Sequence, residues 1–152
     1  MLSTTSEYAL RALAMLASLP RGSSILGRDL ARHTGVPSTY LSKLLSTLHN
    51  AGMVGSARGN NGGYWLAKPA ETIRIYEIVE LFEGPALRRN CLLWPGRECS
   101  PAQPCSAHEA WKSARDAYLR FLDTVSLADI SERPSAGPAK GRPTWWASIR
   151  GD

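Results

Sequence analysis

Apolar residues in the first third of the chain recur at helical spacing in two segments. The spacing predicts a helix over residues 5–18, which the turn at residues 20–22 ends, and a second helix over residues 27–33, which stops at Gly35. The buried positions are Ala9, Leu13 and Leu16 in the first segment and Leu30 and Ala31 in the second. The second helix and the turn at residues 34–36 are the first half of a helix-turn-helix pattern.

A third helix is predicted to follow Pro37, because Leu41, Leu44, Leu45 and Leu48 stand at positions i, i+3, i+4 and i+7. The opposite face carries hydroxyl groups and one cation, which suit groove edges and phosphates. It comprises Ser38, Thr39, Tyr40, Ser42, Lys43 and Thr47. A solvated polar face on an ordinary helix would have a similar composition, so the face alone does not decide its role.

Two short apolar runs, residues 53–54 and 64–67, flank a loop rich in glycine and asparagine over residues 56–63. Such residues permit positive φ at the tip of a hairpin. A lone guanidinium on a slim loop, here Arg58, suits the minor groove or a phosphate. An ordinary polar hairpin is the alternative, but the order helix, turn, helix and hairpin favours a DNA-binding wing. The proposed DNA contacts are Arg28, Ser38, Thr39, Tyr40, Ser42, Lys43, Arg58, Asn60 and Asn61.

The second half of the chain has two further helical patterns separated by an irregular stretch. Ile75, Ile78, Val79 and Phe82 predict one helix that ends at Gly84. Periodicity is then lost over residues 86–104 and returns over residues 108–125. There, one apolar stripe comprises Trp111, Ala114, Tyr118, Phe121, Leu122 and Val125. We expect this stripe to form the seam of a homodimer; folding back onto its own domain is the alternative.

These patterns predict a mainly α fold with four parts. A winged helix-turn-helix DNA-binding domain with a small β-hairpin wing covers residues 1–84, and a cysteine-rich cluster-binding loop covers residues 85–106. A long C-terminal dimerisation helix covers residues 107–130, and a flexible C-terminal tail with a Trp145-Trp146 pair covers residues 131–152.

Charge is divided unequally along the 152 residues. Residues 1–74 hold eight Lys or Arg against three acids, whereas the rest of the chain holds ten of each, so the net charge of +5 belongs to the N-terminal half. A basic face of this kind suits duplex DNA, although a faintly basic solvated surface is equally compatible. The longest uncharged run near the start, residues 12–20, is too short for a membrane span, and we expect a cytoplasmic protein without membrane contact.

All three cysteines lie within fifteen residues, and a histidine follows three positions after the last, in the order Cys91, Cys99, Cys105 and His108. In a reducing compartment, three clustered cysteines argue for ligation or thiol chemistry rather than a structural disulfide framework. Three chemistries remain open: an iron–sulfur cluster, zinc, and a regulatory disulfide without metal. The wide gaps between the cysteines disfavour zinc, which usually binds tighter knuckles.

Five segments together resemble one known group, the Rrf-two family of winged helix-turn-helix transcriptional regulators, which includes iron–sulfur sensors of the IscR and NsrR types. They are Glu7-Tyr8-Ala9-Leu10-Arg11-Ala12-Leu13, Tyr40-Leu41-Ser42-Lys43-Leu44-Leu45, Arg58-Gly59-Asn60-Asn61-Gly62-Gly63-Tyr64, Ile75-Tyr76-Glu77-Ile78-Val79-Glu80 and the cysteine loop. They cover roughly residues 1–130 in the order usual for the family.

The resemblance implies a homodimer that binds a promoter operator, acts most simply as a repressor, and holds an iron–sulfur cluster, with [2Fe-2S] slightly favoured over [4Fe-4S]. It assigns Cys91, Cys99 and Cys105 as ligands. The fourth ligand is His108, at the IscR-like position, or Glu7, where NsrR-like members use a carboxylate from the partner subunit. The motif is C-x(7)-C-x(5)-C-x(2)-H, and its first gap is two residues longer than in IscR-like members.

Two other classes of function are alternatives to DNA-binding regulation by a cluster. A cluster-free regulator would act through thiol oxidation, zinc or an enzyme partner. An enzyme would need one of the cysteines as nucleophile and His33, His49 or His108 as base, but no nucleophile elbow, phosphate loop or paired carboxylates accompany these residues. The sequence therefore predicts a protein that is not an enzyme.

Overall fold

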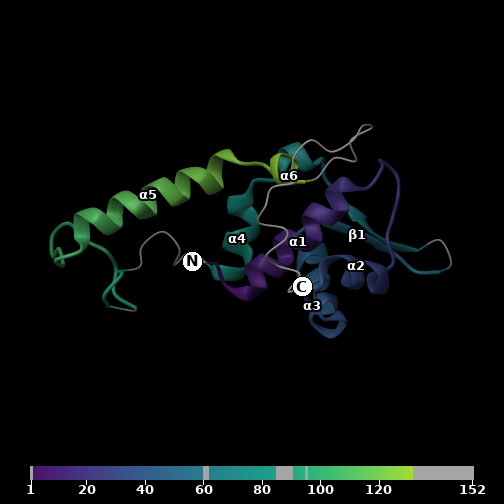
Figure 1. The fold of residues 1–152 in the computed structure, drawn as a ribbon, viewed down its shortest axis with the longest axis horizontal. Coiled ribbons are helices and arrows are strands. Elements are labelled where there is room, and N and C mark those ends of the chain that lie inside the picture. The colour runs from purple at the N-terminus through teal and green to yellow at the C-terminus, as the bar shows by residue number, and fades with distance from the viewer. Residues whose placement is uncertain (1, 60–61, 85–90, 95, 132–152) are drawn as a thin grey trace, which may run out of the picture.

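The computed structural model describes residues 2–59, 62–84, 91–94 and 96–131 of the chain (Figure 1). In chain order the elements are α1 (Thr4–Ser18), α2 (Gly27–Thr34), α3 (Ser38–Asn50), β1 (Val54–Ala57), β2 (Gly63–Leu66), a 3₁₀ turn η1 (Ala70–Thr72), α4 (Ile75–Glu83), α5 (His108–Thr124) and α6 (Leu127–Ile130). The fold is mainly helical with one antiparallel hairpin, as the sequence predicts. Asn60, Asn61 and the predicted tail beyond Ser131 lie outside the described residues.

Helix α1 runs through the middle of the core, where it packs against α2, α3, α4 and α6. Its start is capped by Ser3, whose hydroxyl accepts a hydrogen bond from the Ser6 amide at 3.2 Å. The apolar face predicted for α1 is buried as expected, and the four leucines of α3 are buried opposite it. The polar face of α3 is thereby turned outward.

The turn between α2 and α3 depends on a left-handed residue. Gly35 ends α2 with φ 70° and donates its amide to the Ala31 carbonyl at 2.9 Å. Val36, only 2% exposed, then anchors the turn in the core. This arrangement fixes how α3 leaves α2, which is the defining geometry of a helix-turn-helix.

Strands β1 and β2 form the predicted hairpin, in the register Val54 to Leu66 and Ala57 to Gly63. An isolated antiparallel bridge between Ile25 and Tyr64, which the sequence patterns did not predict, joins the chain before α2 to β2. Gly63 has φ 148°, and a Cβ there would lie 2.7 Å from the Ile25 carbonyl oxygen. Glycine is therefore required where the hairpin meets the chain that leads into α2.

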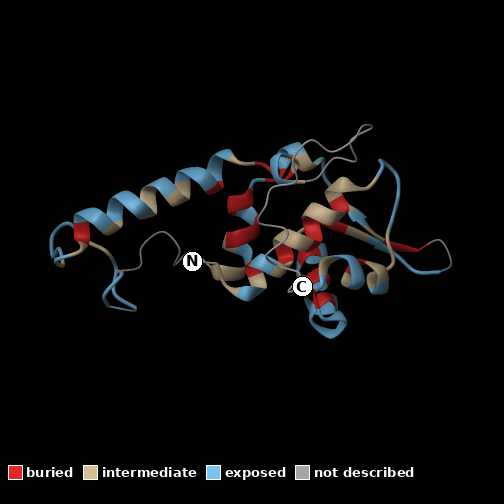
Figure 2. Cartoon of the chain, viewed as in Figure 1, coloured by how far each residue is buried: buried red, intermediate tan, exposed pale blue. Residues whose placement is uncertain are grey.

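The C-terminal end of α5 is attached to the core by backbone hydrogen bonds. The Ile75 amide donates to Val125 at 3.0 Å, and the Leu127 amide donates to the Ile73 carbonyl at 2.8 Å. Leu122 and Leu127 are both fully buried in the core. From this attachment α5 extends away from the winged helix, with mostly exposed residues along it (Figures 1 and 2).

The apolar stripe of α5 therefore lies partly in the core of its own chain and partly on the surface. The expectation that the whole stripe is free to form a dimer seam is wrong at Leu122. Leu122 packs into the core of its own chain, and Tyr118 and Val125 pack against the same core. Phe121 is 50% exposed, and Ala114 is also exposed. Spacing along one helix cannot distinguish these two environments, because both place apolar residues three and four positions apart.

Within the described residues, no helix combines the length and the apolar character needed to cross a lipid bilayer.

Helix α4 ends at Glu83, whose carboxylate is bound by the start of α1. Its Oε1 accepts hydrogen bonds from the Ser3 amide at 2.8 Å and from the Ser6 hydroxyl at 2.6 Å. Burial acts to raise the pKa of Glu83, but the bonds from Ser3 and Ser6 outweigh it and hold the pKa below its ordinary value. The ionised carboxylate therefore stabilises the packing of α1 on α4.

We predict that Gly63→Ala destabilises the fold much more than Gly22→Ala. Both glycines have positive φ, at 148° and 80°, but a Cβ at Gly22 meets no atom within 4 Å. Gly22→Ala should therefore cost only the backbone penalty of about 1–2 kcal/mol. Gly63→Ala should cost about 1–3 kcal/mol more through overpacking. Urea unfolding of the two variants measures the difference, and equal losses would contradict the close contact with Ile25.

We also predict an acid-sensitive contribution to stability from Glu83. Because its folded pKa is lowered from 4.5, the contribution is fully present above pH 4.5 and is lost as the pH falls through the folded pKa. The difference in unfolding free energy between the wild type and Glu83→Gln should be largest at neutral pH and should narrow below pH 4.5. The exposed Glu71→Gln is the control. A difference that does not change with pH would show that the charge of Glu83 has no such role.

Candidate cysteine-loop site and nucleic-acid interface

The loop before α5 is held by hydrogen bonds that do not involve sulfur. The Cys91 amide donates to the Arg97 carbonyl at 2.9 Å, and the Arg97 amide donates to the Trp94 carbonyl at 3.1 Å. The Arg97 guanidinium in turn donates to Gln103 Oε1 at 2.7 Å. These contacts connect the two ends of the loop, so that Cys91 and Cys105 lie near each other.

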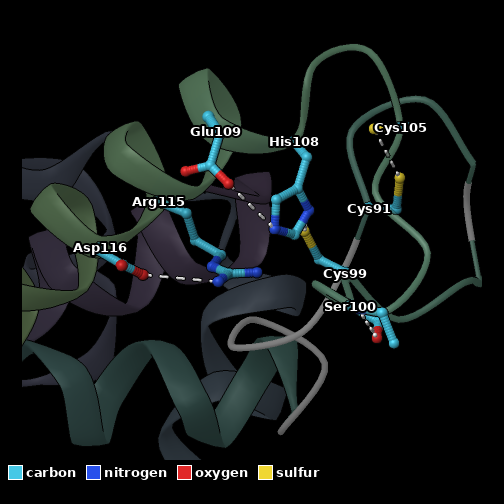
Figure 3. A network of polar contacts seen from close by, with 9 residues as sticks. Cys91, Cys99, Ser100, Cys105, His108, Glu109, Arg115 and Asp116 are labelled. Carbon is cyan, nitrogen blue, oxygen red and sulfur yellow. Dashed lines mark hydrogen bonds and ion pairs between the residues drawn. The ribbon is translucent and has the colours of Figure 1, made fainter.

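Cys91 and Cys105 form the first of two donor pairs. Their Sγ atoms are 3.9 Å apart, and both are half-buried free thiols. The backbone amides of Leu93 and Trp94 donate hydrogen bonds to the Cys91 sulfur and lower the pKa of its thiol, to which the nearby Arg97 charge also contributes. Figure 3 shows the two sulfurs facing each other across the loop.

Cys99 and His108 form the second donor pair. The Cys99 Sγ lies 3.3 Å from His108 Nδ1, and the His108 residue is only 5% exposed at the start of α5. Its other ring nitrogen, Nε2, lies 3.9 Å from the Glu109 carboxylate (Figure 3). His108 is thus not a solvated helix-start residue, because its ring is buried with Nδ1 toward a thiol and a carboxylate behind it.

The structure leaves these two pairs separate. No group of three His, Cys, Asp or Glu side chains among the described residues is close enough to hold a single metal ion. Glu7, the other possible ligand, lies on the exposed side of the first turn of α1, where its carboxylate is 3.9 Å from the Arg11 guanidinium. Arg115, farther along α5, pairs with Asp116 at 3.5 Å (Figure 3).

The predicted DNA-contacting face of α3 is exposed along its whole length. Ser38, Thr39, Tyr40, Ser42 and Lys43 are all exposed, as is Thr47. The Ser42 hydroxyl donates to the Ser38 carbonyl at 3.0 Å, and the Thr47 hydroxyl donates to Lys43 at 3.2 Å. Because these protons are used within the helix, the two oxygens present acceptor lone pairs outward.

Tyr40 is attached to α1, a contact that sequence patterns did not indicate. Its hydroxyl bonds to the Thr5 hydroxyl at 2.5 Å, and its ring meets that of Tyr8 edge to face at 5.6 Å. The Arg11 guanidinium lies 5.6 Å from the centre of the Tyr8 ring. Thr5 and Tyr8 are thirty-two or more positions from Tyr40, so no local spacing could have identified them.

Of the two predicted arginine contacts, Arg28 lines a shallow hollow, and Arg58 directly precedes Gly59, which lines the same hollow. Arg28 is at the start of α2, with its side chain 76% exposed and 3.9 Å from Asp29. Arg58 follows β1 and is exposed. The hollow has a volume of about 470 Å³ and is lined by Leu26, Gly27, Arg28 and Gly59. The remaining predicted contacts, Asn60 and Asn61, lie outside the described residues.

Comparisons with known proteins give one consistent family. Residues 2–133 match the model of the Rrf2 family, described as an iron-dependent transcriptional regulator. The structure of CymR, the global cysteine regulator of B. subtilis, is 29% identical with a TM-score of 0.73, over 86% of this chain and 95% of that one.

Two further solved structures agree with this result. CymR of Staphylococcus aureus is 30% identical with a TM-score of 0.69, over 88% of this chain and 100% of that one. IscR of T. potens is 26% identical with a TM-score of 0.68, over 93% of each chain. Since the family model covers most of the sequence and these structures share the winged helix-turn-helix, this chain belongs to the Rrf2 family of transcriptional regulators.

Proposed function

We propose that this protein is a homodimeric, cytoplasmic transcriptional repressor whose affinity for operator DNA is set by an iron–sulfur cluster. Cys91, Cys99 and Cys105 supply three ligands and His108 the fourth. The observation that carries the proposal is the arrangement of these side chains in two pairs immediately before α5. Family membership supports the DNA-binding part, and the similarity to an IscR supports the cluster.

The spacing within each pair fits two ligands of one tetrahedral iron. With bonds of about 2.3 Å to sulfur and about 2.0 Å to nitrogen, two sulfurs on one metal lie about 3.8 Å apart, and a sulfur and a nitrogen about 3.5 Å apart. The observed separations are 3.9 Å for Cys91 and Cys105 and 3.3 Å for Cys99 and His108. Each pair is therefore already spaced as two ligands of one metal.

Two separate pairs favour a [2Fe-2S] cluster over the alternatives. Such a cluster takes two protein ligands on each of its two irons, and imidazole replaces thiolate on one iron in known centres. A single zinc ion would need all four donors to converge, and no three of the described side chains do so. We assign Cys91 with Cys105 to one iron and Cys99 with His108 to the other.

His108 is preferred to Glu7 as the fourth ligand because of its surroundings. Its ring is 5% exposed and Nδ1 faces a thiol, so the nitrogen that would bind a metal is already directed into the loop. Glu7 is already paired with Arg11 in its own subunit and would have to reach the loop of a partner. When bound, a cluster with one neutral ligand has a higher reduction potential than one with four thiolates.

The dimer is proposed to form through α5. This helix has 17 residues, extends away from its own winged helix, and carries Phe121 at 50% exposure (Figure 1). A second copy packed along α5 would cover Phe121 and bring two α3 helices to one face. Two recognition helices about 34 Å apart would match successive major grooves of a two-fold operator.

DNA contact is proposed for α3 and the wing, with α1 as the element that positions them. Tyr40 is bound to Thr5 and meets the Tyr8 ring edge to face, and the same end of α1 is bound to Glu83, which precedes the segment leading to the cysteine loop. A change in the loop that moves Glu83 would therefore act on α1 and on Tyr40. A change in the distance between the two recognition helices would then lower the affinity for an operator whose half-sites have a fixed spacing.

We predict that anaerobic reconstitution with iron and sulfide gives a coloured protein with two irons and two sulfides per subunit. Cys99→Ser should lose most of the visible absorption, and His108→Ala should bind the cluster about 10–100-fold more weakly or at altered potential. His33→Ala, on the exposed surface of α2, is the matched control and should load normally. Iron and sulfide analysis with Mössbauer spectroscopy provides the measurement.

Three results would contradict the proposed cluster or its assigned ligands. A colourless protein, or a Cys99→Ser variant with unchanged iron and sulfide, would refute the cluster. If the His108→Ala variant still binds the cluster and the Glu7→Gln variant does not, the fourth ligand is Glu7 instead of His108. Zinc bound at one ion per subunit by all four donors would favour the zinc form of the cluster-free alternative.

We also predict that Arg58→Ala weakens binding to an operator selected from random duplexes. The loss should be about 1–3 kcal/mol if Arg58 contacts bases, and the slope of log affinity against log salt should fall by about one if it contacts phosphate. Arg120→Ala, on an exposed part of α5, controls for net charge. Unchanged affinity and salt slope in a titration by fluorescence anisotropy would remove Arg58 from the interface.

A further inference from the structure

The three free thiols of the cysteine loop have unequal surroundings. Cys91 and Cys105 face each other with sulfurs 3.9 Å apart, whereas the Cys99 sulfur is 3.3 Å from His108 Nδ1. Reaction between two cysteines requires their sulfurs to approach to about 2.05 Å. Among the three cysteines of the described loop, only Cys91 and Cys105 have their sulfurs in contact.

We infer that Cys91 and Cys105 form a selective oxidation site, in which a peroxide converts the metal-free thiols into an intramolecular disulfide and leaves Cys99 reduced. The site uses two of the sulfurs assigned above to the cluster, but the inference rests on the positions of the free thiols and does not require that the cluster exists.

The loop brings the two sulfurs together without any metal. The Cys91 amide is bound to the Arg97 carbonyl, and the Arg97 side chain is bound to Gln103, two positions before Cys105. Arg97 therefore bonds Cys91 directly and bonds Gln103 close to Cys105, so it connects the two segments that carry the sulfurs. Both residues are also half-buried rather than enclosed, so a small oxidant reaches them.

Cys99 is kept out of this reaction by His108. The imidazole is 5% exposed and is held in place by its burial at the start of α5, with the Glu109 carboxylate 3.9 Å from Nε2. Cys99 must give up its contact with Nδ1 before it can turn toward either of the other two sulfurs. The loss of one hydrogen bond of ordinary strength corresponds to a factor of about five in rate or population.

The chemistry balances with a peroxide as the oxidant. One thiolate sulfur attacks the O–O bond of hydrogen peroxide, forms a sulfenic acid and releases hydroxide, which takes up a proton to become water. The second thiol displaces the sulfenic hydroxyl as a second water and forms the S–S bond. Two thiols lose two electrons and two protons, and one peroxide becomes two waters.

The disulfide would make loss of the cluster persist until a reductant acts. With Cys91 and Cys105 joined, one donor pair is no longer available as thiolates, while Cys99 and His108 keep their positions. Reloading with iron would then require a thiol reductant first. The loop would thereby distinguish an oxidised subunit from one that lacks only iron.

The test is peptide mapping of metal-free, fully reduced protein treated with one equivalent of hydrogen peroxide and then alkylated. Trypsin cuts after Arg97, so Cys91 and the pair Cys99 and Cys105 fall on separate peptides, and fragmentation then locates the link. We expect the link from Cys91 to Cys105 to exceed the two links that contain Cys99 by at least about fivefold. Cys99→Ser should form it at the same rate, whereas Cys105→Ser should not form it.

His108→Ala provides a second, sharper variant, because it should release Cys99 and raise the yield of links that contain Cys99. Comparable yields for all pairs in the wild type, a link between subunits on a non-reducing gel, or sulfinic acid in place of a disulfide would overturn the inference. Iron and sulfide content of reconstituted protein is measured separately. Disulfide without cluster would refute the proposed function alone, and cluster without disulfide would refute this inference alone.

Discussion

The attachment of one end of α5 to the core determines where the cysteine loop can be. The Ile75 amide bonds to the Val125 carbonyl and the Leu127 amide to the Ile73 carbonyl, while Leu122 and Leu127 are fully buried. Burying two leucine side chains is worth about 3–6 kcal/mol, so this end of the helix is firmly held. The other end begins at His108, which is therefore carried away from the winged helix together with the cysteines (Figure 1).

The same core connects the loop to the proposed DNA-binding face through α1. Glu83, the last residue of α4, receives hydrogen bonds from Ser3 and Ser6 at the start of α1. One turn of the same helix holds Tyr40 of α3 through Thr5 and Tyr8. The start of α1 thus contacts both Glu83, which precedes the segment leading to the cysteine loop, and Tyr40 of α3, so it physically connects the proposed ligand site with the proposed DNA-binding face.

The cysteine loop itself combines two kinds of chemistry in one arrangement. Four donors in two pairs are spaced as ligands of two tetrahedral metals, and one of those pairs is also spaced for oxidation to a disulfide. His108 distinguishes the pairs because it binds Cys99 and leaves Cys91 and Cys105 facing each other. The two roles proposed for its ring, as a ligand and as the partner of Cys99, both depend on its burial at the start of α5.

The sequence by itself determined the main helices, the hairpin, the family and the three cysteines that are proposed as ligands, because each of these follows from local spacing or from short motifs. Leu41, Leu45 and Leu48 specify the buried face of α3 wherever the helix lies. Only the tertiary structure decided that Leu122 belongs to its own core rather than to a partner, that Tyr40 is held by Thr5, and that the donors form the pairs Cys91–Cys105 and Cys99–His108. These are contacts between residues distant in the chain or across an irregular loop, and periodicity carries no information about which surfaces meet there.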